Sequence, residues 1–170
     1  MKYILETERL TLREFVPGDT AFILELVNSP GWLKFIGDRN IKTTEQAKAY
    51  LENGPIKSYR ENGFGLAMVE TKDHKEQIGM CGIIKRDSLI KPDIGFAFLP
   101  EFTGKGYAFE MAFATINYAI QKLNIPVVYA ITVENNVHSI KLLEKIGLKF
   151  IKTTSSPENE ELLLYSNENN

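Results

Sequence analysis

Cysteine, histidine and long apolar runs are scarce in this chain of 170 residues. Its single cysteine, Cys81, excludes an intrachain disulfide, and we expect a cytoplasmic location because that compartment keeps thiols reduced. The two histidines and Cys81 lie far apart along the chain and show no metal-site spacing, so no metal is expected. The longest apolar run, IPVVYAITV, is far shorter than the roughly 20 residues of a membrane span. The N-terminus also lacks an apolar signal-peptide core, so no membrane contact is expected.

A strong excess of one charge is also missing. The chain has 20 Lys and Arg residues against 22 Asp and Glu residues. The resulting net charge of −2 provides no basic field for nucleic acid, which we therefore do not expect as a partner. Hydrophobic residues make up 44% of the chain and charged residues 25%, a balance typical of a globular domain. We expect one domain over residues 1–170, with a disordered tail from about residue 167.

Hydrophobic patterning predicts a mixed α/β sheet with flanking helices. Apolar and polar residues alternate in residues 9–16, which predicts a half-buried strand, and Asp19 is placed to cap the helix that follows. Thr43 and Gln46 have the spacing of a capping box and predict another helix start, whereas the segment SPGWLKFIGDRN interrupts helical structure. Further strands are predicted at residues 63–70, 77–85, 93–99, 125–133, 148–156 and 160–166, and further helices at residues 55–62, 105–123 and 139–147.

Two glycines, Gly104 and Gly106, lie between the strand at residues 93–99 and the helix at residues 105–123. A helix N-terminus presents backbone N–H groups without partners and a partial positive charge, and glycine lets a phosphate approach the backbone closely. The turn therefore predicts a pyrophosphate site, although a flexible turn without a ligand also explains the glycines. A P-loop sequence is absent, and Phe109 takes the place of the third Rossmann glycine, which argues against a nucleotide-binding domain.

Residues 103–108, TGKGYA, resemble the acetyl-CoA motif R/Q-x-x-G-x-G/A of the GNAT N-acetyltransferases, with Thr103 in place of the usual first residue. The segments TERLTLREFVPGD, FIGDRNIKTTEQAKAYL, PDIGFAFLPEFTGKGYAFE and ENNVHSIKLLEKIGLKF resemble, in the same order, the RimJ/RimL-like branch of that superfamily, the ribosomal-protein-alanine acetyltransferases. The resemblance implies the GNAT fold, a central, mostly antiparallel mixed sheet that is flanked by helices. That sheet is splayed between its fourth and fifth strands, which are residues 93–99 and 125–133 in this chain.

The same resemblance implies an acetyl-CoA-dependent N-acetyltransferase. It would move an acetyl group to a primary amine, of a small molecule or a protein N-terminus, by direct attack. A CoA-binding module without turnover, acting as a sensor or partner-binding protein, is the alternative. The residues expected to bind acetyl-CoA are Phe98 and Leu99 through their backbone, Gly104, Lys105, Gly106, Tyr107 and Ala108 at the pyrophosphate, and Asn136 at the pantetheine arm.

Ser139 and Asp93 are the catalytic candidates that the resemblance implies. Ser139 takes a position at which RimJ/RimL-like members often have serine, and it would act at the leaving sulfur because Leu143 replaces the tyrosine of many GNAT enzymes. Asp93 matches the acidic residue that opens the fourth strand, and it would accept the amine proton through water. Structural explanations stay open: Asn136 as a helix cap, a locally satisfied Ser139 and a solvated Asp93. The identity of the amine acceptor and a homodimer also stay open.

Overall fold

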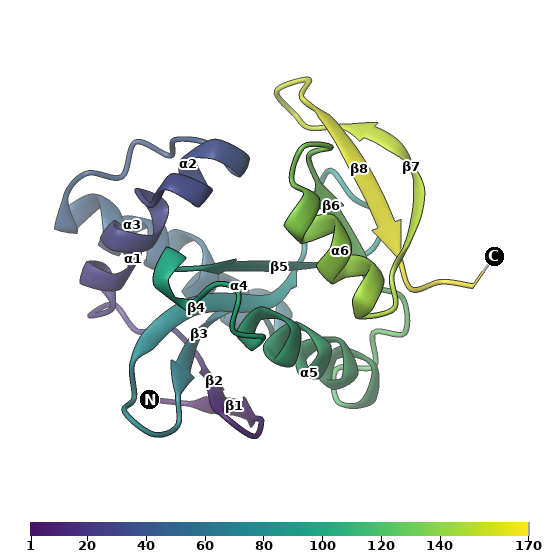
Figure 1. Ribbon diagram of the computed structural model, residues 1–170. Coiled ribbons are helices and arrows are strands. Elements are labelled where there is room, and N and C mark those ends of the chain that lie inside the picture. Colours follow the sequence, from purple (N-terminus) through teal and green to yellow (C-terminus); the bar gives the residue numbers. More distant parts are fainter. Residues whose placement is uncertain (170) are drawn as a thin grey trace.

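The computed structural model describes residues 1–169, and its centre is one eight-stranded sheet (Figure 1). The strands follow the order β1-β2-β3-β4-β5-β6-β8-β7, and every neighbouring pair is antiparallel except β5 and β6. The predicted fold class, a mostly antiparallel mixed sheet flanked by helices, is therefore confirmed. The strands are β1 (Tyr3–Glu6), β2 (Leu10–Arg13), β3 (Leu66–Thr71), β4 (Gln77–Ile84), β5 (Asp93–Phe98), β6 (Tyr129–Thr132), β7 (Lys149–Ser155) and β8 (Glu161–Ser166). The helices are α1 (Thr20–Val27), α2 (Pro30–Phe35), α3 (Thr44–Asn53), α4 (Pro55–Asn62), α5 (Tyr107–Gln121) and α6 (Val137–Lys145), with a short 3-10 helix η1 (Pro100–Phe102) after β5.

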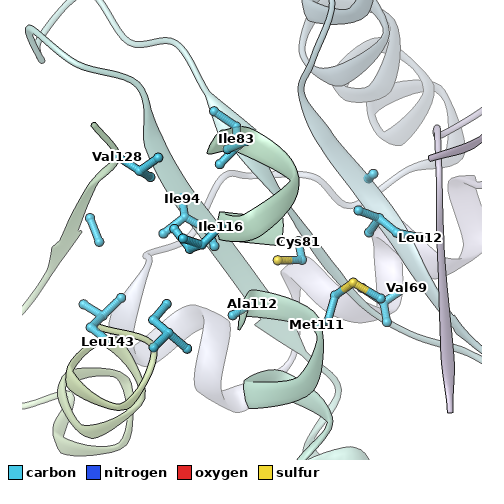
Figure 2. Close-up of a cluster of buried hydrophobic side chains, with 14 of the residues drawn as sticks. Leu12, Val69, Cys81, Ile83, Ile94, Met111, Ala112, Ile116, Val128 and Leu143 are labelled. Atoms are coloured by element: carbon cyan, nitrogen blue, oxygen red, sulfur yellow. The ribbon is translucent and has the colours of Figure 1, made fainter. Parts of the chain in front are cut away.

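Helices cover both faces of the sheet at β2–β5, and alternate strand residues there enter two separate cores. Ala67 and Val69 of β3 join the core beneath α5 and α6, whereas Met68 between them joins the core beneath α1 and α3. Figure 2 shows the first core, in which Met111 of α5 lies beside Val69 and Cys81 of the sheet. Because both faces are covered, we expect a binding site where the pairing of the strands is interrupted.

That interruption lies between β5 and β6. The two parallel strands are in register only at Asp93 and Tyr129, where the Tyr129 N–H donates to the Pro92 carbonyl at 2.9 Å. By contrast, β4 pairs with β5 from Asp93 to Phe98, and β8 pairs with β6 over the whole length of β6. The two strands therefore diverge beyond Asp93, and we call this divergence the gap. It corresponds to the splay that the family resemblance implies between the fourth and fifth strands.

The elements differ from the sequence-based expectation in three places. β1 pairs with the predicted first strand, so the predicted fourth and fifth strands are β5 and β6. α2 occupies a segment that was expected to be irregular, because Pro30 favours the first turn of a helix and Trp32 packs into the core. The capping box at Thr43 is confirmed. Asp19 does not cap α1 with its side chain; its carboxylate binds Arg13 instead.

The end of the described chain is held by hydrogen bonds. Asn167 accepts a hydrogen bond from the Val128 N–H at 2.8 Å and donates one to the Pro126 carbonyl at 3.1 Å. Asn167, the first residue of the predicted disordered tail, is thus anchored to the chain before β6, and Asn170 lies outside the described residues. Within residues 1–169, none of the helices combines the length and the apolar character that crossing a membrane requires.

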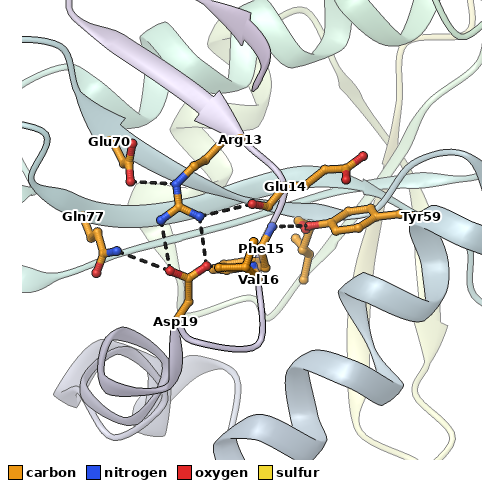
Figure 3. Close-up of polar contacts among 9 residues, drawn as sticks. Arg13, Glu14, Phe15, Val16, Asp19, Tyr59, Glu70 and Gln77 are labelled. Carbon is orange, nitrogen blue, oxygen red and sulfur yellow. Dashed lines mark hydrogen bonds and ion pairs between the residues drawn. The ribbon is translucent and has the colours of Figure 1, made fainter. Parts of the chain in front are cut away.

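A buried arginine joins β2 to β3 and α1 (Figure 3). The Arg13 Nε donates to Glu70 at 2.7 Å, and its two terminal nitrogens donate to the two Asp19 oxygens at 2.9 and 3.0 Å. Only 1% of Arg13 is exposed, so the prediction of a half-buried strand is wrong here: β2 is buried on both faces. Burial alone would lower the pKa of Arg13, but the hydrogen bonds to Asp19 and Glu70 raise it above its ordinary value, and the guanidinium stays charged.

The variant Arg13→Met tests how much this cluster stabilises the fold. It leaves two buried carboxylates without their cation, so we expect the free energy of unfolding to fall by about 3–5 kcal/mol. Denaturant unfolding measures the change. Lys2→Met is the control, because the ion pair between Lys2 and Glu14 at 2.9 Å is exposed and its loss should leave the midpoint unchanged. An Arg13→Met protein as stable as the wild type would show that the cluster does not stabilise the fold.

Candidate functional site

The glycine turn lies between the end of β5 and the start of α5 (Figure 1). Its two glycines adopt a left-handed backbone, with φ of +74° at Gly104 and +81° at Gly106. This conformation costs other residues roughly 1–2 kcal/mol. Gly106 is the N-cap of α5 and has no side chain that could bond to the first helical turn. The N–H groups of Tyr107, Ala108 and Phe109 therefore have no partner within the helix and lie at the positive end of its dipole.

Arg9, in the loop between β1 and β2, lies behind this turn. Its Nη1 donates to the Lys105 carbonyl at 3.0 Å, and its guanidinium lies 4.4 Å from the centre of the Tyr107 ring. Glu110 of α5 accepts hydrogen bonds from the Arg9 backbone N–H, the Arg9 Nε and the Thr7 hydroxyl at 2.8, 2.7 and 2.6 Å. Burial alone would raise the pKa of Glu110, but these hydrogen bonds and the Arg9 charge lower it. The N-terminal hairpin thus fixes the conformation of the turn.

Alternate residues of β5 direct their backbone groups toward β4 and toward the gap. The Leu99 N–H donates to the Ile78 carbonyl at 2.9 Å, which places Leu99 on the β4 side. The Pro92 carbonyl bonds to β6, so residues of that parity, including Phe96 and Phe98, direct their N–H and carbonyl groups toward the gap. Phe98 therefore stays a candidate for pairing with the pantetheine arm. The expectation for Leu99 is wrong, because its N–H is already used by β4 and its side chain is buried in the core.

Asp93 lies at the closed end of the gap. Its side chain is 1% exposed, and the Arg86 Nε donates to both carboxylate oxygens at 2.9 and 3.1 Å. Burial raises the pKa of Asp93 above its ordinary value, and the Arg86 charge and hydrogen bond partly offset this. Asp93 is therefore not a solvated residue at a strand end but a buried carboxylate paired with the half-exposed Arg86. A proton from the gap would have to reach it through water.

Asn136 and Ser139 lie at the start of α6, after the end of β6. The Asn136 Oδ1 accepts a hydrogen bond from the Ser139 N–H at 3.2 Å, so the helix-cap explanation of Asn136 is confirmed. Ser139 is half-buried, and its hydroxyl makes no hydrogen bond to the rest of residues 1–169. Leu143, one turn further along α6, is 1% exposed and belongs to the core beneath α5 and α6. The first turn of α6 therefore contributes the Ser139 hydroxyl to the candidate site.

The remaining polar candidates do not form a site. Cys81 is fully buried beside Thr115, and burial raises its thiol pKa to about 12, so it is an inert core residue. Within residues 1–169, no group of His, Cys, Asp and Glu side chains could hold a metal ion. Two surface hollows of about 460 and 340 Å³ lie elsewhere, between α3, α4 and the end of β4 and between α1 and η1. Neither is lined by the glycine turn or by Asp93.

Sequence reasoning missed the roles of Arg9, Arg86 and Glu110. Arg86 and Asp93 lie seven residues apart on either side of the connection between two paired strands, a spacing that could have indicated an ion pair. Arg9 and Glu110 are 101 residues apart, and no local pattern links them. Glu110 lies in the first turn of α5, where the helix dipole alone accounts for an acidic residue, so its position gives no sign of its contacts with the N-terminal hairpin.

Comparison with known proteins agrees with this arrangement. The family described as Acetyltransferase (GNAT) domain matches residues 9–149. YoaA, an uncharacterized N-acetyltransferase of Bacillus subtilis (strain 168), is 26% identical over 147 residues, which cover 86% of this chain and 82% of YoaA. The acetyltransferase from Agrobacterium tumefaciens str. C58 has a similar fold, with a TM-score of 0.83 and 24% identity over 99% of this chain and 95% of that chain. RimL, a ribosomal L7/L12 alpha-N-protein acetyltransferase in complex with coenzyme A, shares the fold with a TM-score of 0.83 and 13% identity over 97% of each chain. The chain is therefore an enzyme of the GNAT acetyltransferase family.

Proposed function

We propose that the protein transfers an acetyl group from acetyl-CoA to a primary amine, of a small molecule or a protein N-terminus, by direct attack of the amine on the thioester. The observation that carries the proposal is the single register point of β5 and β6, at Asp93 and Tyr129, followed by the glycine turn. Beyond Asp93, β5 has backbone groups that β6 does not use, and an extended pantetheine arm can pair with them as a strand would. The coenzyme A complex of RimL, which shares this fold, supports the same assignment.

The positions of the glycine turn and of Asp93 define the orientation in which acetyl-CoA would bind. The first turn of α5, with the N–H groups of Tyr107 and Ala108, would bind the pyrophosphate, and Lys105 would add a mobile cation. The inner edge of β5, with Phe98, would bind the pantetheine arm and direct the thioester toward the closed end of the gap. A backbone N–H of β5 would then polarise the thioester carbonyl, a contact that typically contributes roughly 10²–10³ in rate.

Two side chains would move protons in this reaction. The amine must lose a proton before it attacks, and Asp93 would accept that proton through water, because its side chain is 1% exposed. The raised pKa that burial gives Asp93 makes it a better base than an exposed carboxylate. The Ser139 hydroxyl would donate a hydrogen bond or proton to the leaving sulfur. A weak acid suffices there, because a thiol with a pKa of about 8.5 leaves readily as thiolate.

An acceptor panel tests the proposed function. We expect acetyl-CoA at 100 times its Kd to raise the free energy of unfolding by about 2.7 kcal/mol. Amino acids, polyamines, antibiotic amines and peptides with free N-termini are then tested for release of free CoA thiol and for a mass gain of one acetyl group. Binding without release for every acceptor would favour the alternative, a CoA-binding module without turnover. A protein that binds neither acetyl-CoA nor CoA would contradict both.

Removal of the Ser139 hydroxyl tests its role in thiolate departure. We expect Ser139→Ala to lower kcat by roughly 10²-fold, as for loss of a general acid, and to leave the Kd of acetyl-CoA nearly unchanged. The cap of α6 should survive, because Asn136 accepts from the Ser139 backbone N–H. Ser139→Thr, which keeps a hydroxyl, is the control and should retain most of the rate. If the chemical step limits the rate and Ser139→Ala has the same kcat as the wild type, Ser139 has only a structural role.

The pH dependence of kcat/KM tests Asp93. In the wild type the ionised carboxylate is the active form, so kcat/KM should fall as the pH drops through the raised pKa of Asp93. Asp93→Asn should lose this acidic limb and be slower at neutral pH by roughly 10²–10⁴-fold. Its rate should recover in part as rising pH deprotonates the amine in solution. A purely structural Asp93 would instead give parallel pH profiles for both proteins, with any loss of rate following a loss of stability.

A further inference from the structure

The peptide group between Lys105 and Gly106 has one side fixed by Arg9. No peptide bond in the described chain is cis, so the Gly106 N–H points away from the Lys105 carbonyl. The Arg9 Nη1 holds that carbonyl at 3.0 Å, and the Gly106 N–H is therefore directed to the opposite side of the turn. A Cβ on Gly106 would lie 3.3 Å from the Arg9 Nη2, so the side-chain direction of Gly106 also faces Arg9. Arg9 thus occupies the back of the turn and leaves its front to a ligand.

Arg9 also compensates a charge that would disfavour a phosphate. Glu110 lies in the first turn of α5, where its carboxylate would repel an anion bound to the same helix N-terminus. The Arg9 Nε and backbone N–H bind the two oxygens of this carboxylate at 2.7 and 2.8 Å, and the Thr7 hydroxyl adds a third hydrogen bond. The guanidinium therefore orients the turn and neutralises Glu110 at the same time. A fork-shaped cation can reach both groups at once, whereas a lysine ammonium is a single point.

We infer that Arg9 is a positioning residue for the pyrophosphate of acetyl-CoA, which it serves by fixing the turn and neutralising Glu110 from behind without contacting the ligand. This inference rests on the proposed function of the glycine turn. It adds a residue of the N-terminal hairpin to a site that the motif at residues 103–108 describes only in part. Its consequence is specific: loss of Arg9 should matter for ligands with a pyrophosphate and not for ligands without one.

Binding measurements with three ligands test the inference without the amine acceptor. CoA and dephospho-CoA carry the pyrophosphate, and pantetheine lacks it. We expect Arg9→Ala to raise the Kd of CoA and of dephospho-CoA each by about 10- to 100-fold, because the hydrogen bond that orients the turn and the cation that neutralises Glu110 are both lost, and to leave the Kd of pantetheine unchanged. Calorimetry measures the two CoA ligands and NMR titration measures pantetheine. Lys2→Ala is the matched control, because its exposed ion pair with Glu14 lies in the same hairpin.

A second variant separates position from charge and guards against a folding defect. Arg9→Lys keeps the charge but cannot hold Glu110 and the Lys105 carbonyl together, so we expect it to bind CoA almost as weakly as Arg9→Ala. Unfolding midpoints without ligand show whether each variant is folded. Wild-type affinity for CoA in either variant, or an equal loss for pantetheine, would overturn the inference. A wild-type protein that does not bind CoA would overturn the proposed function itself, which is a distinct result.

Discussion

The parallel strands β5 and β6 share a single register point, and the arrangement of the site depends on it. Each strand is anchored on its outer side, β5 by β4 and β6 by β8, so the divergence between them is held open by the rest of the sheet. Strand backbone groups that lose their partners cost free energy unless something else bonds to them. The residues of β5 that face the gap, Phe96 and Phe98, are therefore disposed to accept an extended ligand. Asp93, paired with Arg86, lies at the point where the pairing between β5 and β6 stops.

Three arginines add side-chain contacts to those that strand pairing provides. Arg13 links β2 to β3 and α1, Arg86 joins the connection after β4 to the start of β5, and Arg9 links the N-terminal hairpin to α5. Each binds a carboxylate that is buried or half-buried, and Arg9 and Arg13 also donate to a backbone carbonyl. The guanidinium suits this work because it presents several donors in one plane. The fold therefore uses arginine where the geometry must be fixed in more than one direction.

Local patterns predicted most of the elements, and long-range contacts account for the errors. The capping box at Thr43 and the glycine turn depend on neighbouring residues, and both can be read from the sequence. The alternation in residues 9–16 predicted a strand with one buried face, and only the packing of α1 over the other face shows that Arg13 is buried as well. Leu99 was placed in the gap because strand parity cannot be assigned without the register of β4 and β5. The ion pairs of Arg9 and Arg86 also were not predicted from local patterns, because tertiary structure brings their partners together.

The contact between Arg9 and Glu110 has a consequence for how the protein is made. The two residues are 101 positions apart, so the turn before α5 reaches its final geometry only after the N-terminal hairpin has docked onto that helix. Contacts of such long range form late, because the entropy of closing a large loop must be overcome first. On the ribosome the hairpin emerges long before α5, and although β2 can pair with β3 earlier, Arg9 cannot bind Glu110 until nearly two thirds of the chain has been synthesised. Phosphate affinity at this turn would therefore be acquired at the end of folding, and a nascent or truncated chain would not compete with the finished enzyme for CoA.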